Sequence, residues 1–154
     1  MRVLCLICAL AAGTASATTL QMLSTDQMIR QSTAIVRAKV TGSSTIARGS
    51  AIYTVYRLSV EETLKGSGTF DSVSVPGGAL GGLRQMVSGA PSLAIGQDYV
   101  IFLWTSRSGL TQIIGLSQGL FSVTLDSSGD GVLTRPGSSM KLSDLRSQVQ
   151  KVLN

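Results

Sequence analysis

Two stretches near the start of the chain alternate between apolar and polar positions. The first runs from Ala34 to Val40, where the even-numbered residues are apolar and Arg37 and Lys39 lie among the others. The second runs from Ala51 to Thr63. One side of it carries Ile52, Thr54, Tyr56, Leu58 and Val60, and the other carries Tyr53, Val55, Arg57 and Ser59. A period of two places alternate side chains on opposite faces, so the pattern predicts a half-buried antiparallel strand pair.

The two predicted strands differ in length. The second is long enough that we expect it to be strongly bent or bulged, as strands are where a barrel turns a corner. Between them, Gly42–Gly49 is polar and contains no long apolar run, so it is predicted to be a loop.

Further apolar segments predict a mainly β protein. Tyr99–Trp104 is the most apolar run after the N-terminal segment, as expected of a strand buried on both faces, with Trp104 packed in the core or at its rim. The other predicted strands are Phe70–Val75, Leu83–Val87, Gln112–Leu116 and Leu120–Leu125. A hairpin turn is predicted at Ser106–Gly109, and a bulge is predicted at Gly119, between the last two of these strands.

Glycines at positions 77, 78, 81 and 82 allow two interpretations. A phosphate cradle needs a helix directly after the glycines, whereas Leu83–Val87 has the composition of a strand. The sequence therefore favours a mobile glycine-rich loop.

A helix is predicted at each end of this β region. Ser24 and Gln27 form a capping-box pattern, which indicates a helix of about two turns that ends near Ser32. At the other end, Leu142–Leu153 carries a single apolar stripe, and Ser143 is its predicted N-cap. We expect this amphipathic helix to pack across the sheet or to close one end of a barrel.

The loop Asp126–Gly131 resembles the first half of a calcium-binding loop. It has oxygen-bearing side chains at relative positions 1, 3 and 5 and a glycine at position 6. Position 12 is Gly137 rather than the bidentate glutamate, and no helix is predicted beside the loop. Because the same residues are typical of hairpin turns, a plain turn is favoured over a weak calcium site.

The N-terminus has the three parts of a secretory signal: Arg2, an apolar run from Val3 to Ala12, and small residues at Ala15–Ala17. The run is about half the length of a membrane span. We therefore expect cleavage after Ala17, a secreted or periplasmic protein with no membrane span, and a single domain over residues 18–154. Of the 154 residues, 137 then remain, with 12 basic and 8 acidic side chains scattered along them. Without clustering, this charge does not indicate nucleic-acid binding.

The inventory of reactive side chains argues against an enzyme. The chain has no histidine, and both cysteines, Cys5 and Cys8, lie in the predicted signal segment. A Ser-His-Asp or Cys-His relay and an ordinary zinc site are therefore excluded from the mature chain. Glu61 and Glu62 are adjacent on a strand and are expected to point to opposite faces, so they do not form a catalytic carboxylate pair. We expect no catalytic residue, no cofactor and no metal.

Three segments carry a resemblance to a known family: Ala34–Val40, Tyr56–Gly66 and Ile95–Phe102. Together they resemble the OB-fold barrel of tissue inhibitors of metalloproteinases and netrin-like domains. More narrowly, Val75–Gly78, Gly89–Pro91 and Gly115–Phe121 are similar to an uncharacterised group of small secreted bacterial proteins. The resemblance covers roughly residues 32–123. It implies a closed or partly open antiparallel OB-like barrel, flanked here by the two predicted helices.

The resemblance does not extend to the inhibitory mechanism of that family. Those inhibitors chelate the protease zinc through an N-terminal cysteine, whereas the predicted mature chain begins Thr18-Thr19-Leu20 and has no cysteine. The leading hypothesis is therefore a secreted, non-catalytic module that binds a protein or another extracellular ligand. The alternative is an inhibitor of a secreted protease that acts without zinc chelation. Barrels of this type bind ligands beside strands two and three, so the candidate face residues are Tyr53, Tyr56 and Arg57, although aromatic residues on strands more often serve packing.

Overall fold

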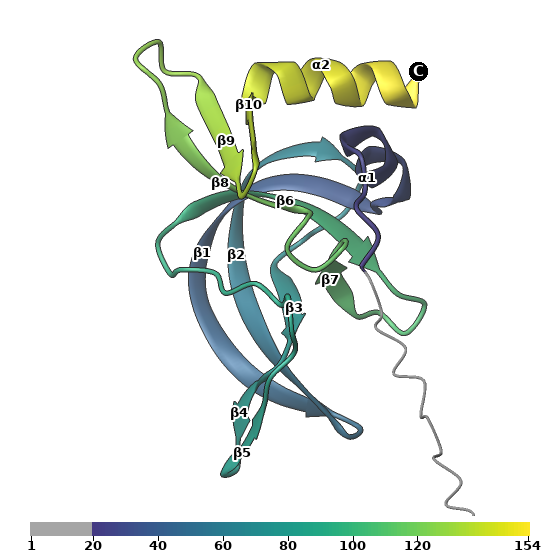
Figure 1. Cartoon of the computed structure of the whole chain (residues 1–154), viewed down its shortest axis with the longest axis vertical. Helices are drawn as coiled ribbons and strands as arrows, with labels where there is room; N and C mark the ends of the chain where they lie inside the picture. Colours follow the sequence, from purple (N-terminus) through teal and green to yellow (C-terminus); the bar gives the residue numbers. More distant parts are fainter. Residues whose placement is uncertain (1–19) are drawn as a thin grey trace, which may run out of the picture.

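The structure is a computed structural model, and it describes residues 20–154. The predicted signal segment, with Cys5 and Cys8, lies outside the described residues. Within residues 20–154 the chain forms two helices and ten strands, arranged as in Figure 1. In chain order they are α1 (Thr25–Gln31), β1 (Ala34–Arg48), β2 (Ala51–Lys65), β3 (Ser72–Pro76), β4 (Gly78–Leu80), β5 (Leu83–Gln85), β6 (Asp98–Thr105), β7 (Thr111–Ile113), β8 (Leu120–Leu125), β9 (Gly131–Arg135), β10 (Ser138–Lys141) and α2 (Leu142–Leu153).

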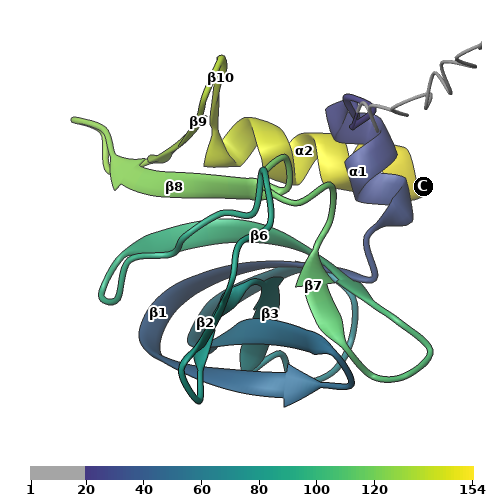
Figure 2. The same cartoon turned by 60° about the horizontal axis from the view of Figure 1, so that its bottom comes forward.

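All strand pairs are antiparallel, which confirms the prediction of a mainly β protein with a short helix at each end. The main sheet has the order β10-β9-β8-β6-β1-β2-β3, and β7 pairs with β6. Strand β6 thus has β1 along one edge and β8 followed by β7 along the other. The strands β1, β2 and β3 curl away from β6, as Figure 2 shows.

The buried side chains form two cores, one on each side of β6. We call the core inside the curl the inner core. It consists of Ala34, Val36, Ala38, Val40, Tyr56, Leu58, Val73, Val75, Leu93, Tyr99, Ile101, Leu103 and Ile113. The outer core lies beneath the helices. It consists of Met28, Ile29, Ile35, Val100, Phe102, Ile114, Phe121, Val123, Leu133, Leu142, Leu145 and Val149. The predicted burial of β6 on both faces is confirmed from Tyr99 to Leu103.

The predicted alternation of β1 and β2 is confirmed, but the loop predicted at Gly42–Gly49 is wrong. Strand β1 continues to Arg48, which pairs with Ala51, so the connection is only the two-residue turn Gly49–Ser50. The polar side chains of this segment misled the prediction. They are tolerated because the extended part of β1 is largely exposed, while its backbone pairs with β2.

The predicted bending of β2 is confirmed by three breaks in the β1–β2 register. The pairing skips Leu64 and Glu61 on β2 and Thr41 on β1. An extra residue on one strand bends the pair and increases its twist. These bulges therefore produce the curl that encloses the inner core.

Several other predicted boundaries change. Strand β3 begins at Ser72 rather than at Phe70, and β7 covers only Thr111–Ile113. The glycine-rich segment is neither a phosphate cradle followed by a helix nor an unstructured loop: it is the β4–β5 hairpin, with the turn at Gly81–Gly82. Strands β9 and β10 were not predicted, because their mixed sequences lack a clear period of two.

The N-terminal helix begins as predicted and ends against a lysine from β2. Ser24 and Gln27 exchange the two hydrogen bonds of a capping box. At the other end, Lys65 Nζ donates to the carbonyl oxygens of Ile29 at 2.5 Å and Ser32 at 2.6 Å. Cations stabilise the carbonyl end of a helix. Burial lowers the pKa of Lys65 below its ordinary value.

The C-terminal helix packs its apolar stripe on the outer core through Leu142, Leu145 and Val149. Its predicted N-cap is wrong: Lys141 occupies that position and makes no side-chain cap. Ser143 lies inside the helix, and its Oγ donates instead to Asp130 Oδ2 at 2.6 Å. The Ser143 hydroxyl therefore bonds to the β8–β9 turn and not to the helix backbone. This contact is set by the tertiary structure, so the local sequence does not predict it.

A glutamine side chain holds the beginning of the described chain. Gln118 Oε1 accepts from the Leu23 backbone nitrogen at 2.7 Å, and its Nε2 donates to the Gln21 carbonyl at 3.0 Å. Arg135 fixes the turn that carries Gln118, because it donates a hydrogen bond to the Gln118 carbonyl. The guanidinium of Arg135 also lies 4.8 Å above the centre of the Phe121 ring. The segment before α1 is therefore tied to the outer core through its backbone.

The two cores make a specific prediction for two aromatic residues on β6. Phe102 is fully buried in the outer core, whereas Trp104, two residues later, is 44% exposed. Phe102→Ala should lower the free energy of unfolding by about 3–5 kcal/mol, because it leaves a cavity among packed side chains. Trp104→Ala is the matched control and should cost less than half of that. Urea denaturation of both variants measures the difference, and equal losses would contradict the assignment of Phe102 to a core.

Candidate functional site

The candidate site lies on the outer face of β2 and β3, opposite the inner core. Cross-strand pairing places Ile46, Tyr53 and Pro76 side by side, and it aligns Arg57 with Ser72. Residues that pair directly in an antiparallel sheet share a face. The long β1–β2 hairpin and β3 therefore present one continuous surface.

Arg57 lies across the neighbouring strand. A side chain at Gly42 would bring its Cβ within 2.8 Å of Arg57 Nη2, so the missing side chain leaves the space that the guanidinium occupies. Arg57 is exposed, and it forms no ion pair with any residue of the described chain. Its charge is therefore available to a ligand.

A hollow of about 220 Å³ opens on this face between the β1–β2 hairpin and the β6–β7 loop. It is lined by Ile46, Arg48, Val55, Ser72, Ser74, Gly109, Leu110 and Thr111. The β6–β7 loop is held in shape by Ser106, whose Oγ accepts from the Leu110 backbone nitrogen at 3.1 Å. At its base, the hydroxyls of Thr105 and Thr111 lie 2.9 Å apart and share a hydrogen bond. The wall of the hollow is therefore preformed.

The three predicted face residues lie on two different surfaces. Tyr53 is half-buried and Arg57 is exposed on the outer face, whereas Tyr56 is only 8% exposed and belongs to the inner core. The structure thus brings Tyr53 and Arg57 to one surface and separates Tyr56 from them.

Sequence reasoning missed Ile46 and Arg48 because it ended the first strand at Val40. The β-branched pair Thr45-Ile46 was the available signal that the strand continues. It also missed Gly109–Thr111, for which no local signal exists, since their position beside β3 is set by the pairing of β7 with β6.

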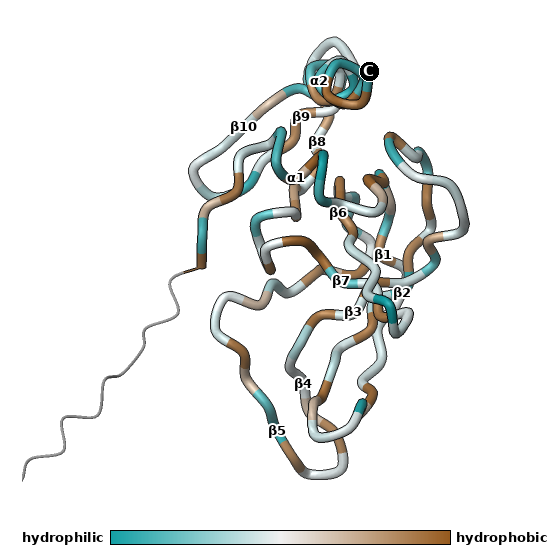
Figure 3. The backbone as a smooth tube through the Cα atoms, turned by 90° about the vertical axis from the view of Figure 1, so that its right-hand side faces the viewer, coloured by the Kyte–Doolittle hydropathy of each residue, from teal (hydrophilic) through white to brown (hydrophobic). Residues whose placement is uncertain are grey.

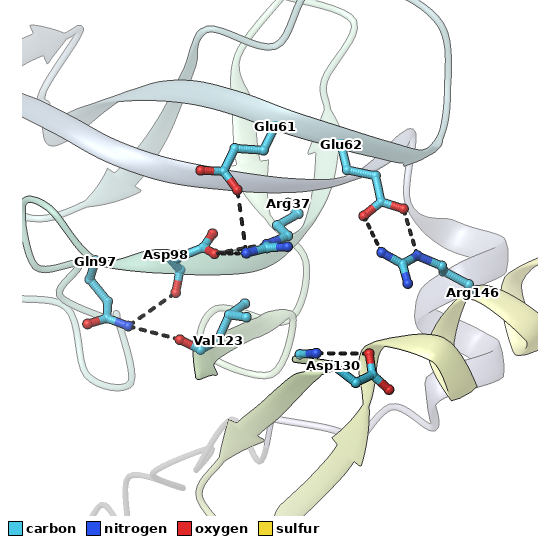
Figure 4. A network of polar contacts seen from close by, with 9 residues as sticks. Arg37, Glu61, Glu62, Gln97, Asp98, Val123, Asp130 and Arg146 are labelled. Atoms are coloured by element: carbon cyan, nitrogen blue, oxygen red, sulfur yellow. Dashed lines mark hydrogen bonds and ion pairs between the residues drawn. The ribbon is translucent and has the colours of Figure 1, made fainter. Parts of the chain in front are cut away.

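A separate network of charged side chains joins the sheet to α2, as Figure 4 shows. Arg37 donates to Asp98 Oδ2 at 2.6 Å and lies 3.5 Å from Glu61. Arg146 on α2 makes two hydrogen bonds of 2.8 Å to Glu62, which hold the pKa of that carboxyl below its ordinary value. The expectation that the two glutamates point to opposite faces is wrong, because the bulge at Glu61 lets both reach cations on the side of the helix. Each of these carboxylates is engaged by an arginine, so none of them is free to act as a catalytic pair.

The loop Asp126–Gly131 forms the turn between β8 and β9. Asp126 Oδ1 accepts from the backbone nitrogen and hydroxyl of Ser128 and from the Asp130 backbone nitrogen, at 2.8, 2.6 and 3.0 Å. Its Oδ2 lies 3.3 Å from Lys141 Nζ. With the carboxylate engaged inside the loop, these contacts favour the plain turn over the calcium site. In the part of the chain that the structure describes, no cluster of three acidic, histidine or cysteine side chains is arranged to hold a metal.

Comparison with known proteins adds no relationship. The chain matches no protein-family model, and no curated protein is significantly similar to it in sequence. Among residues 20–154, neither helix is long and apolar enough to cross a membrane.

The hydrogen bonds of the Asp126–Gly131 turn predict an unusually low pKa for the carboxyl group of Asp126. Hydrogen bonds, first of all from the Ser128 hydroxyl, lower the pKa of Asp126 from 3.8 to about 2. A carboxyl whose pKa falls on folding stabilises the fold above its unfolded pKa, and this contribution is lost as the pH drops through the folded value. Ser128→Ala should raise the pKa of Asp126 towards 3.8, whereas Ser127→Ala should leave it unchanged. Carboxyl NMR titration measures both, and a value near 4 in the unmodified protein would contradict the turn geometry.

Proposed function

We propose that β1, β2, β3, β7 and β6 form a partly open barrel of OB type. The proposal is supported by a ring of neighbours: β1 pairs with β2, β2 with β3, β6 with β1 and β7 with β6. The ring is completed by β3 and β7, which lie against each other without a hydrogen-bonded ladder. A five-stranded barrel with one open seam is characteristic of the OB fold, and the inner core fills the interior of this ring.

We further propose that the protein is a secreted or periplasmic, non-catalytic module that binds a protein or another extracellular ligand. One observation carries this proposal: the hollow on the outer face of β2 and β3 is bounded by the β1–β2 and β6–β7 connections. Along the chain the five strands of the ring follow one another as β1, β2, β3, β6 and β7, so these connections follow the first and the fourth of them. OB barrels bind extended ligands at this position. Secretion rests on the predicted signal segment.

The lining suggests the chemistry of the ligand. Ile46, Val55 and Leu110 are apolar, whereas Arg48 and Arg57 add positive charge to the same face. Neither arginine is paired with a carboxylate among residues 20–154. Together these features fit an extended protein segment that carries acidic and apolar side chains, since charge complementarity gives specificity and buried apolar contacts give affinity.

A variant of the outer face tests this proposal. Tyr53→Ala/Arg57→Ala removes one aromatic and one charged side chain from the face, and Lys151→Ala/Leu153→Ala removes an exposed cation and an exposed apolar side chain from the end of α2. Tagged residues 18–154 of each form are used to recover proteins from the native secreted fraction, with quantification by mass spectrometry. At least one partner should decline tenfold or more with the face variant and remain with the α2 control. Recovery of every partner by the face variant would contradict the assignment.

Inhibition of a secreted protease is the alternative proposal, and it rests on the resemblance to metalloproteinase inhibitors. Without the N-terminal cysteine, contact with the protease would have to come from the outer face or the projecting hairpins. Titration of residues 18–154 against secreted metalloproteases and serine proteases tests it. Slowed cleavage that is relieved by Tyr53→Ala/Arg57→Ala is the expected result, and unchanged rates at micromolar excess would exclude it.

A further inference from the structure

The β4–β5 hairpin projects from the end of the molecule farthest from α2, as Figure 1 shows. Its base is fixed to β2. The Gly77 backbone nitrogen donates to the Ile52 carbonyl at 2.8 Å, and the Ile52 nitrogen donates to Gln85 Oε1 at 2.7 Å. A side chain at Gly78 would meet Thr54 Oγ1 at 2.9 Å and Thr45 Cγ2 at 3.0 Å, so the hairpin sits closely on β1 and β2. The base of the hairpin is therefore held in place by β1 and β2, and its tip projects from them.

The tip of this hairpin is apolar and exposed. Leu80 and Leu83 pair across the strands and share a face, and they are 39% and 71% exposed. Met86, just beyond β5, is 82% exposed. The turn between the leucines is Gly81–Gly82. Figure 3 shows hydrophobic colour on both sides of this turn.

The same end of the molecule carries positive charge without acidic residues. No Asp or Glu occurs between Asp71 and Asp98, where the hairpin lies, or between Asp26 and Glu61, which includes the whole β1–β2 turn. Arg84 on β5 and Arg48 beside that turn are both exposed. Two adjacent hairpins thus combine exposed apolar side chains with uncompensated cations.

We propose that the β4–β5 tip docks on an anionic phospholipid bilayer. Leu80 and Leu83 would enter the boundary between headgroups and acyl chains, while Arg84 and Arg48 contact lipid phosphates. Burial of apolar area together with electrostatic attraction to anionic lipids is the basis of interfacial binding. A bilayer is favoured over a protein partner because the apolar tip is convex and a bilayer accepts it without a matching pocket. The inference does not rest on the proposed function, since Leu80, Leu83 and Arg84 do not line the hollow and only Arg48 borders both surfaces.

Co-sedimentation of residues 18–154 with vesicles tests the proposal. Vesicles of equal parts phosphatidylglycerol and phosphatidylcholine are compared with vesicles of phosphatidylcholine alone. The anionic vesicles should bind the protein at least tenfold more tightly, and Leu80→Ser/Leu83→Ser should reduce this binding tenfold or more. Arg84→Gln should reduce it about fivefold, the effect of one cation near an anionic surface. Leu125→Ser is the matched control, because Leu125 is 66% exposed on β8, and it should bind like the unmodified protein.

A second measurement does not depend on the stability of the serine variants. In a Trp104→Phe background, Leu83→Trp places the fluorophore at the tip, and its emission should shift to the blue on addition of anionic vesicles. Leu125→Trp in the same background should show no shift. The proposal is overturned by absent binding to anionic vesicles, by equal binding to neutral vesicles, or by equal effects at positions 83 and 125. It is also overturned if the tip variants keep vesicle binding but lose a protein partner, which would identify the tip as a protein-docking surface.

Discussion

The burial of β6 on both faces is the constraint on which the rest of the structure depends. Ile101 and Leu103 belong to the inner core, while Val100 and Phe102 belong to the outer core. Because side chains alternate along a strand, a register shift of one residue would exchange the two sets and leave neither core packed. The curl of the hairpin on one side and the seating of the helices on the other are both arranged around this one segment.

The β1–β2 hairpin links that central segment to the candidate site. Its three bulges bend it around the inner core, so that its outer face and the β6–β7 loop bound the same hollow. The bulge at Glu61 also directs carboxylates towards the helix side, where Arg146 ties α2 to β2. An exposed ion pair of this kind contributes little to stability by itself. Here the ion pair fixes the orientation of α2, while the packing of the apolar stripe of α2 on the outer core provides the stability.

Local patterns predicted much of the fold, and tertiary contacts decided the rest. The period of two identified the inward residues of β1 and β2, and the capping box identified the beginning of α1. The loop assigned to Gly42–Gly49 failed because a polar strand is recognised only through its partner, and Ser143 failed as an N-cap because Asp130, distant in sequence, takes its hydroxyl. The residues of the candidate site also fall into those that local patterns predict and those that tertiary contacts place. Tyr53 and Arg57 follow from alternation, whereas the wall formed by Gly109–Thr111 depends on the pairing of β6 with β7.

The contact between Gln118 and the segment before α1 has a consequence for how this sequence can change. The glutamine amide binds a backbone nitrogen at Leu23 and a backbone carbonyl at Gln21. The contact therefore depends on the path of the backbone and not on which side chains these two residues carry. Gln21 and Met22 are exposed, so substitutions there leave the attachment intact. The sequence at positions 21 and 22 can thus change while the Gln118 amide keeps the first helix in place.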